Sequence, residues 1–300
     1  MSGRVADAGP LAGRAATAAG AVRARRRPGW GLVLAVPVVF LAVFFLLPLG
    51  NVALTSFTEP GLSNYTQLLE TPLYGRTLAR TFQVAFVITL ACLLLGYPYA
   101  YAMHRARGGV AALLAALVLL PFWTSILVRS YSWTALLQDT GVVNSLLLDL
   151  GLAERPVALI RNLLGVVIGM SHILLPFMVL PLYASMQRID SRLVQAAGTL
   201  GASPATAFRK VFLPLSMPGV VAGSLLVFVL SLGFYITPSL LGGPADTLIG
   251  ELIVQKFSEQ LDFGVGSALA VVLLVATLVV LLLGSRLTRL GALVGQEEER

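Results

Sequence analysis

The side chains that most often carry out catalysis or bind metals are scarce in this chain of 300 residues. Its one cysteine, Cys92, excludes a disulfide framework or a cluster of metal-bound thiolates within the chain. Its two histidines, His104 and His172, form no convincing catalytic set with a serine and an acid. We therefore expect no catalytic residue, no metal site and no enzymatic activity.

The positions of the two histidines favour structural roles. His172 follows Ser171 inside a long apolar run without carboxylates, which favours a hydrogen-bonded packing role over a proton relay or a ligand site. His104 lies beside Arg105 at the end of another apolar run, a position typical of a membrane interface.

The lysines exclude one class of enzyme. A phosphate-binding loop of the form G-x-x-x-x-G-K-[ST] needs its lysine for the terminal phosphates and its hydroxyl for magnesium. The only lysines are Lys210, which precedes Val211, and Lys256, which precedes Phe257, so neither fits the motif. The chain is therefore no ATPase of this type, and any energy from ATP has to come through another polypeptide.

The elements that position these residues are long apolar segments. The chain is 57% hydrophobic and 12% charged, whereas a soluble domain carries about 25% charged residues. A helix needs roughly 20 apolar residues to cross the hydrocarbon core of a bilayer. Six runs of at least 21 residues lack Asp, Glu, Lys and Arg: 28–58, 81–103, 108–128, 162–187, 211–245 and 263–285. The sequence therefore predicts an all-α membrane protein with six transmembrane helices.

The basic residues indicate the orientation of these spans. If the N-terminus is cytoplasmic, the inner segments hold 15 of the 21 Lys and Arg residues and a net charge of +10, against −3 for the remainder. Cytoplasmic loops of membrane proteins carry such an excess of basic residues. We therefore expect both termini in the cytoplasm, and no nucleic-acid partner. The inner segments are 1–28, 104–108, 186–213 and 285–300.

The two ends of the chain are predicted to be cytoplasmic tails. Residues 1–28 are rich in Ala, Gly and Arg, which predicts disorder. Their final Arg25-Arg26-Arg27 fits an anchor at the inner interface, with a specific site for anionic lipid as the alternative. The apolar region of a cleaved signal peptide has about 7–15 residues, so the longer first run favours an uncleaved span. Residues 286–300 form the C-terminal tail.

A compact segment of small, polar and basic residues, 190–214, separates the fourth and fifth spans. Asp190 or Ser191 can cap a helix over about 192–199. Gly201 can take the left-handed conformation that ends this helix. The helix carries two side chains of almost no bulk, which let another protein approach closely: Ala196 and Ala197.

A second short helix is predicted over about 204–212, because Ser203 followed by Pro204 is a helix start signal. Its Arg209 and Lys210 are available to lipid phosphates or to acidic residues of a partner. The next span then opens at Leu213-Pro214. Since the fifth run is longer than one span, we expect a surface approach at its start and a non-helical outer loop at its end.

The spacing in this segment resembles a motif of the permease subunits of ABC importers. The motif E-A-A-x3-G-x9-I-x-L-P matches Gln195-Ala196-Ala197, Gly201 and Val211-x-Leu213-Pro214 throughout. The resemblance implies that 29–285 is the transmembrane domain, and that this cytoplasmic coupling loop docks on an ATPase subunit and transmits nucleotide-driven motion. Gln195 stands where Glu is usual, which removes a salt bridge and still allows a hydrogen bond.

The same resemblance implies the partners and the location. The chain itself would bind no cofactor, since ATP and magnesium belong to a dimer of ABC ATPase subunits. A second permease subunit completes the pathway, and a different chain is favoured over a second copy. An extracytoplasmic solute-binding protein delivers the solute. The complex would lie in the inner membrane of a prokaryotic cell, with lipid around it, and transport by alternating access.

Two further stretches resemble the spermidine/putrescine branch of these permeases. They are PFWTSILVRSYSWTALLQDTG at 121–141 and FYITPSLLGGP at 234–244, both at predicted outer ends of spans. We expect them to line the pathway or the outer gate, and an interfacial aromatic belt is the alternative. The candidate residues are Phe122, Trp123, Arg129, Tyr131, Tyr235, Thr237 and Pro238.

The sequence leaves other solutes and other functions open. Related permeases carry amino-acid derivatives, opines, thiamine or iron. No carboxylate lies within the six runs, so a tight polyamine site in the membrane is not expected. An autonomous secondary carrier usually keeps ionisable residues in its spans, which disfavours that class. Three outer acids either dock the binding protein or belong to solvated loops: Glu251, Glu259 and Asp262.

Two pairs of glycines predict close packing of the spans beside the loop. Gly165-x-x-x-Gly169 lies in the fourth span and Gly219-x-x-x-Gly223 in the fifth. Such spacing allows two helix backbones to approach closely. Rigid packing here could carry loop motion into the membrane, although packing alone is the default interpretation.

Overall fold

The computed structural model describes residues 29–297, and within this range the chain is helical with no strand. The predicted N-terminal tail, 1–28, lies outside the described residues, as do 298–300. Five helical segments are long and apolar enough to cross a membrane: Ala35–Thr58, Pro72–Arg105, Leu163–Met186, Pro204–Leu232 and Phe263–Gly284. The prediction of an all-α membrane protein is confirmed, and a bent pair of helices brings the candidate spans to six if it counts as one.

The bent pair replaces the third predicted span, 108–128. Helix α5 (Gly109–Leu119) and the 3-10 turn η2 (Leu120–Trp123) have 11 and 4 residues, so together they reach about 22 Å, short of a bilayer core. The following helices, α6 (Ile126–Leu137) and α7 (Val142–Asp149), turn away by 101°. The third predicted span is therefore bent in the structure. Pro121 explains the break, because it has no N–H to donate and its ring crowds the preceding turn.

The chain divides into two compact units, 1–50 and 51–300. In the first unit the described helices are α1 (Gly29–Leu41) and the π-helical turn η1 (Ala42–Leu46), and α2 (Leu47–Thr58) begins there. Its large apolar side chains from Val36 to Leu47 are exposed, including Phe40 and Phe44, whose ring centroids lie 4.6 Å apart. An exposed row of large apolar side chains is a stable surface in lipid.

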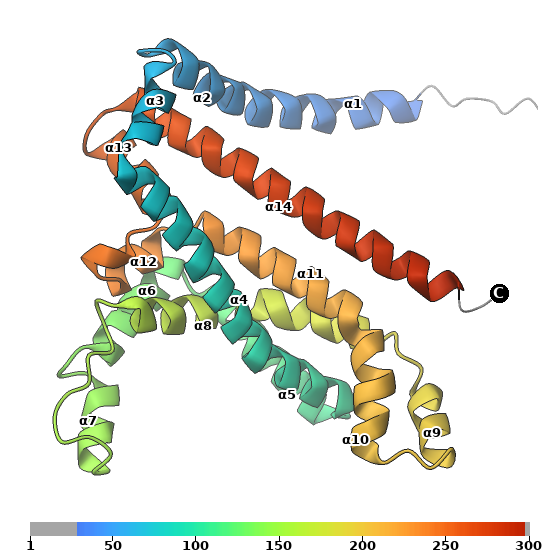
Figure 1. The fold of residues 1–300 in the computed structure, drawn as a ribbon. Helices are drawn as coiled ribbons and strands as arrows, with labels where there is room; N and C mark the ends of the chain where they lie inside the picture. The colour runs from blue at the N-terminus through green and yellow to red at the C-terminus, as the bar shows by residue number, and fades with distance from the viewer. Residues whose placement is uncertain (1–28, 298–300) are drawn as a thin grey trace, which may run out of the picture. The chain divides into compact units, whose positions relative to one another are not determined.

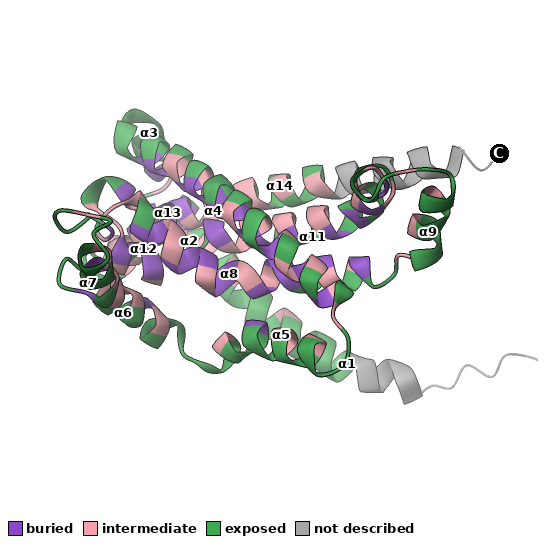
Figure 2. Ribbon diagram, turned by 90° about the horizontal axis from the view of Figure 1, so that it is seen from below, coloured by how far each residue is buried: buried purple, intermediate pink, exposed green. Residues whose placement is uncertain are grey.

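The second unit is built on three packed helices (Figure 1). They are α4 (Pro72–Arg105), α8 (Leu163–Met186) and α11 (Leu213–Leu232). Figure 2 shows buried residues along these helices, and the fully enclosed side chains include Ile88, Met178 and Leu182. The remaining helices are α3 (Ser63–Glu70), α9 (Ser191–Thr199), α10 (Pro204–Ala207), α12 (Ile236–Leu241), α13 (Ile249–Ser258) and α14 (Phe263–Glu297).

Both glycine pairs lie at close helix contacts, but with different neighbours. A Cβ atom on Gly219 would lie 3.1 Å from the Cα atom of Leu182 on α8. One on Gly223 would lie 3.1 Å from the carbonyl oxygen of Met178, also on α8. Gly165 and Gly169 instead face α12, where Leu241 would obstruct a side chain on either of them. The prediction of close packing is confirmed. Helix α11 packs against the second half of α8, and α12 packs against its start.

The loop between the fourth and fifth spans and the segment around α12 lie at opposite ends of this bundle (Figure 1). Helix α8 joins the two ends, and its 24 residues span about 36 Å. We call the end with α9 and α10 the loop end, and the end with α6, α12 and α13 the α12 end. The separation is suited to sites on the two faces of a membrane.

The second short helix of the loop is not separate from the fifth span. Helix α10 runs through the π-helical turn η3 (Phe208–Phe212) directly into α11, so that 204–232 is continuous. The predicted end near 212 is wrong for a local reason. Pro214 cannot donate a backbone hydrogen bond, and the wider π-helical turn just before it accommodates its ring without ending the helix.

Candidate functional site

The coupling-loop residues are held by local capping. Asp190 Oδ1 accepts a hydrogen bond from the N–H of Arg192 at 2.9 Å, which starts α9. Gly201 has φ +86°, the left-handed conformation that a side chain would strain. Ser203 Oγ accepts from the N–H of Thr206 at 3.3 Å and caps α10. These local interactions fold 190–206 into α9, a glycine turn and the start of α10.

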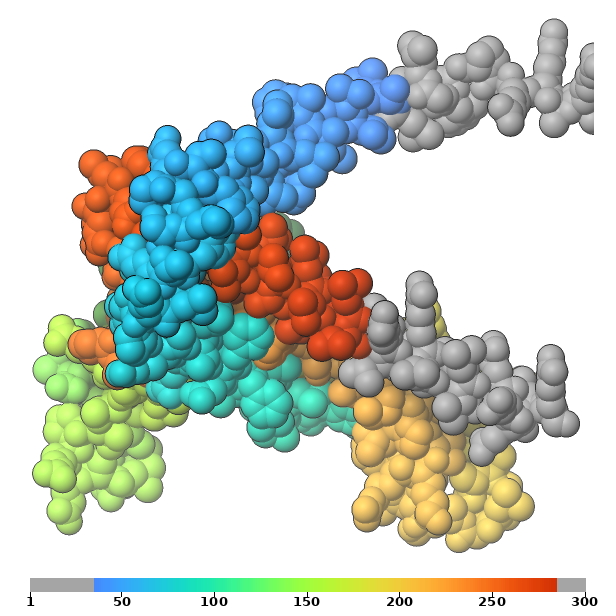
Figure 3. Space-filling view, turned by 45° about the horizontal axis from the view of Figure 1, so that its top comes forward, coloured from blue at the N-terminus to red at the C-terminus, as the bar shows by residue number. Residues whose placement is uncertain are grey.

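Helix α9 presents an apolar stripe to its surroundings. Leu193, Ala196 and Leu200 share one face at a helical spacing of i, i+3, i+7, and all three are exposed. Leu200 has 88% of its surface exposed. Gln195 is also exposed, while Ala197 is half-buried. The three side chains leave an apolar surface exposed, and Figure 3 shows this segment, in yellow and gold, projecting from the second unit.

A basic pocket lies between the loop and the end of α4. It has a volume of about 1020 Å³ and is lined by Tyr101, His104, Arg105 and Arg107 on one side and by Gln195 and Phe208 among others on the opposite side. None of the lining residues is acidic. The predicted Arg209 and Lys210 lie outside the pocket on the exposed surface of η3. The loop end is therefore strongly positive.

Aromatic rings connect the loop to α4. The ring of Phe208 lies 5.4 Å from Tyr101, and that of Phe212 lies 5.1 Å from Tyr101 and 5.4 Å from His104. The hydroxyl of Tyr97 is 2.9 Å from that of Ser216 at the start of α11. These contacts make η3 and the end of α4 one packed body. The aromatic residues at 97–101 and 208–212 were visible in the sequence, but nothing in their spacing indicated that they meet.

Leu213 and Pro214 begin α11 and are half-buried and exposed, respectively. Neither touches the pocket. They shape the continuous helix that leads from the loop into the bundle. Of the nine predicted loop residues, Gln195 is therefore the one that the structure brings to the pocket.

At the α12 end, the two predicted pathway stretches meet. Helix α6 packs on α12, and the hydroxyls of Ser130 and Thr237 lie 2.9 Å apart in a fully buried contact. Pro238 is buried beside them. Thr237 therefore links the two helices, and neither Thr237 nor Pro238 is exposed.

The aromatic candidates are more accessible. Trp123 is 90% exposed and Tyr131 60% exposed, while Tyr235 lies at the start of α12 with 41% exposed. Phe122 packs its ring on that of Phe177 at 5.1 Å. Tyr131 follows Ser130 on α6 and Tyr235 precedes Thr237 by two residues, so these two exposed rings lie next to the buried contact in the sequence.

Arg129 and His172 lie between α6 and α8. Trp133 Nε1 donates a hydrogen bond to His172 Nδ1 at 3.2 Å, and the two rings meet edge to face at 5.6 Å. His172 is thus a hydrogen-bonded packing residue, as the sequence favoured. Arg129 is half-buried, and its Nε atom has no hydrogen-bond partner among the described residues. Within 29–297 no group of three His, Cys, Asp or Glu side chains offers a metal site.

The three outer acids have different settings. Asp262 pairs with Lys256 at 3.3 Å and accepts a hydrogen bond from the N–H of Val265 at 3.1 Å, which starts α14. Burial raises the pKa of Glu251, and the neighbouring charge of Glu259 raises it further. Glu259 itself is exposed. Only Glu259 behaves as a solvated loop residue.

Comparison with known proteins identifies the family of this chain. The family of binding-protein-dependent transport system inner membrane components matches residues 27–290. The chain belongs to this family. The family resemblance inferred from the loop motif is therefore confirmed, and the chain is a multi-pass membrane protein of a transport system.

Individual relatives agree with this family. The spermidine/putrescine transport system permease protein PotB of Escherichia coli (strain K12) is 40% identical over 229 residues, covering 76% of this chain and 83% of that protein. The protein of the same name from Haemophilus influenzae is 36% identical over 250 residues, covering 80% and 87%. A crystal structure of a bacterial alginate ABC transporter matches with a TM-score of 0.69 at 19% identity, covering 87% of this chain and 93% of that chain. The similarity to the alginate transporter structure shows a shared fold.

Proposed function

We propose that this chain is a non-catalytic permease subunit of an ATP-driven ABC importer, and that ATP is hydrolysed with magnesium by a partner ATPase. The observation that carries the proposal is α9. It is a capped surface helix with an exposed apolar stripe, and it stands at the family's loop position. An exposed stripe of this kind is suited to burial in a groove of another protein.

The charge distribution supports a cytoplasmic loop end. The segments 104–108 and 186–213 carry six basic residues and one acid, Asp190. All of them lie at the loop end, which fits the excess of basic residues in cytoplasmic loops. With this orientation both termini are cytoplasmic, and 29–285 is the transmembrane domain between a tail at 1–28 and another at 286–300.

The packing suggests how ATPase motion reaches the membrane. A partner that moves α9 also moves η3, because the loop is short and capped at both helices. Phe208 and Phe212 then transmit this motion to α4 through Tyr101, and the continuous helix transmits it to α11. Since α4, α8 and α11 are packed together, the bundle can tilt as a unit and open the pathway alternately to each side.

We propose a polyamine as the solute, since the PotB relatives are spermidine/putrescine permeases by name. Exposed aromatic faces at the α12 end, on Trp123, Tyr131 and Tyr235, can attract ammonium groups. The five long candidate spans contain no Asp or Glu, so affinity has to come from a solute-binding protein and the second permease subunit. A different small solute on the same pathway is the alternative.

Uptake of labelled putrescine and spermidine tests this function. Cells that lack this gene and any redundant polyamine system are compared with cells in which the gene is restored. We expect restored uptake that also requires the partner ATPase gene. Unchanged uptake, with the protein present in the membrane, would exclude the polyamine assignment.

A further inference from the structure

The segment that follows α12 begins where the last residue of α12 contacts α8. It comprises residues 242–248 and includes the short 3-10 turn η4 (Pro244–Asp246). The N–H of Asn162 donates to the carbonyl oxygen of Leu241 at 3.3 Å, and Asn162 Oδ1 accepts from the N–H of Gly165 at 3.0 Å. A Cβ atom on Gly165 would lie 3.1 Å from the same carbonyl oxygen of Leu241. The end of α12 therefore fits tightly on the first turn of α8.

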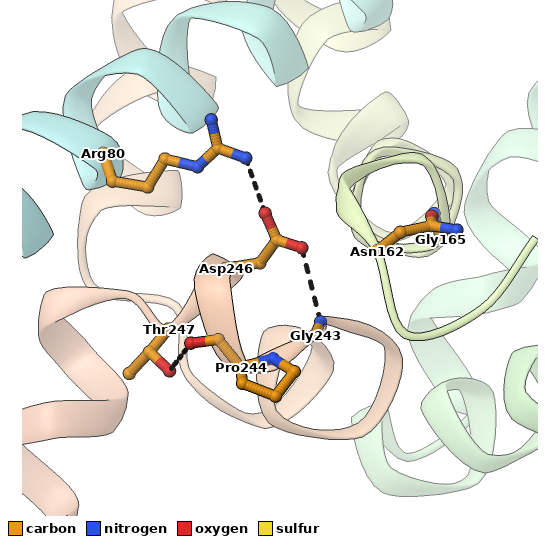
Figure 4. Close-up of polar contacts among 7 residues, drawn as sticks. All are labelled: Arg80, Asn162, Gly165, Gly243, Pro244, Asp246 and Thr247. Atoms are coloured by element: carbon orange, nitrogen blue, oxygen red, sulfur yellow. Dashed lines mark hydrogen bonds and ion pairs between the residues drawn. The ribbon is translucent and has the colours of Figure 1, made fainter.

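The other end of this segment is anchored to α4 by an ion pair (Figure 4). Arg80 Nη2 lies 2.6 Å from Asp246 Oδ1, and the second oxygen of Asp246 accepts a hydrogen bond from the N–H of Gly243 at 3.3 Å. One residue further along α4, Thr81 Oγ1 accepts from the N–H of Ile249 at 2.9 Å. The segment thus crosses from α8 to α4 and is held at both helices.

The burial of Asp246 makes Arg80 necessary. The side chain of Asp246 is 8% exposed and that of Arg80 is 34% exposed. A carboxylate that is shielded from water is stable only with a partner charge and hydrogen bonds, and Asp246 has one of each. Gly243, which donates to Asp246, lies against the backbone just before α8, because a Cβ atom there would lie 2.5 Å from the carbonyl oxygen of Arg161.

We propose that Arg80 and Asp246 are positioning residues for transport. Their ion pair fixes the segment after α12 to α4, so that α12 and the exposed Tyr235 at its start move with the bundle when the pathway opens. Neither residue has to touch the solute for this role. The inference rests on the proposed function, because it concerns the α12 end as the outer part of the pathway.

The test measures solute transported per ATP hydrolysed in proteoliposomes. The complex contains this chain, its ATPase, the second permease subunit and the solute-binding protein. This ratio does not depend on the amount of complex that assembles. The variants are R80Q, D246N and the double variant R80Q/D246N. The matched control is R76Q, because Arg76 lies one turn earlier on the same helix and has no ion pair among the described residues.

We expect the ratio to fall about tenfold in the double variant, as α12 loses its anchor while ATP hydrolysis continues. The double variant leaves no buried charge unpaired, so it is expected to assemble even if a single variant does not. R80K keeps the charge, so its transport per ATP should stay close to the wild-type value. R76Q should leave transport per ATP unchanged.

A ratio at the wild-type level in R80Q/D246N would overturn the proposal, as would an equal fall in R76Q. Failure of the proposed function would look different. In that case the wild-type complex itself would transport no polyamine, or would transport it without ATP, before any variant is compared.

Discussion

Leu200 is the large side chain whose exposure most needs a partner. It sits at the end of α9 with 88% of its surface exposed, on the same face as Leu193 and Ala196. An isolated exposed leucine is ordinary on a protein surface. An exposed apolar stripe along a surface helix is less common, and the proposed coupling role would account for it.

Replacing Leu200 with Asp should weaken the association with the ATPase subunit. A charge in the centre of an apolar contact costs about 2 kcal/mol, or a roughly 30-fold loss in affinity. The measurement is the affinity of purified ATPase for the permease complex. Leu69→Asp is the matched control, since Leu69 is 87% exposed on α3. Equal affinities for L200D and wild type would contradict the docking role of the stripe.

At the scale of helices, Gly219 lies at a close contact between α11 and α8. A Cβ atom would lie 2.5 Å from Ser185 Cβ and 3.1 Å from Leu182 Cα. The second neighbour is backbone and cannot rotate away. Even one methyl group at Gly219 therefore has to move one helix relative to the other.

Gly219→Ala should destabilise the protein by about 1–3 kcal/mol through overpacking and reduce the coupling of ATP hydrolysis to transport. Gly75→Ala on α4 is the control, because a Cβ atom there meets nothing within 4 Å, and Ala in place of a helical Gly stabilises by up to about 1 kcal/mol. Thermal unfolding in detergent and transport per ATP are measured for both. An unchanged melting temperature and unchanged coupling in G219A would contradict the prediction that the contact between α8 and α11 is too close for a methyl group.

The elements that were predictable from the sequence are those set by local signals. Asp190, Gly201 and Ser203 act within a few residues, and the caps and the turn lie where they were expected. The charge-free runs predicted the apolar helices because a run of apolar residues is also a local property of the sequence. Pro121 is a local signal for a break, but the 101° angle of the bend and the continuous helix through Pro214 depend on how the helices pack.

The candidate site was only partly predictable. The loop motif drew attention to Gln195 and the alanines, yet the exposed Leu193 and Leu200 complete the stripe. Contacts between distant segments, such as Tyr101 with Phe208 or Arg80 with Asp246, depend on how helices pack. Nothing in the local sequence separates the buried Thr237 from the exposed Tyr235 two residues before it.

At the scale of the whole molecule, the proposed function requires that the loop end and the α12 end face opposite sides of the membrane. The one native cysteine, Cys92, is buried, so single introduced cysteines report their own accessibility. L200C should react with a membrane-impermeant maleimide only after cells are opened, whereas L69C should react from outside the inner membrane. The opposite labelling pattern would reverse the orientation.

Transport driven by a partner ATPase is the central claim. Its most direct measurement is uptake of labelled polyamine into proteoliposomes that contain the purified complex, with the solute-binding protein outside the vesicles and ATP inside. We predict uptake that requires both ATP and the binding protein, and that is lost in L200D. Uptake that proceeds without ATP, or that follows an imposed ion gradient, would contradict the account and identify an autonomous carrier.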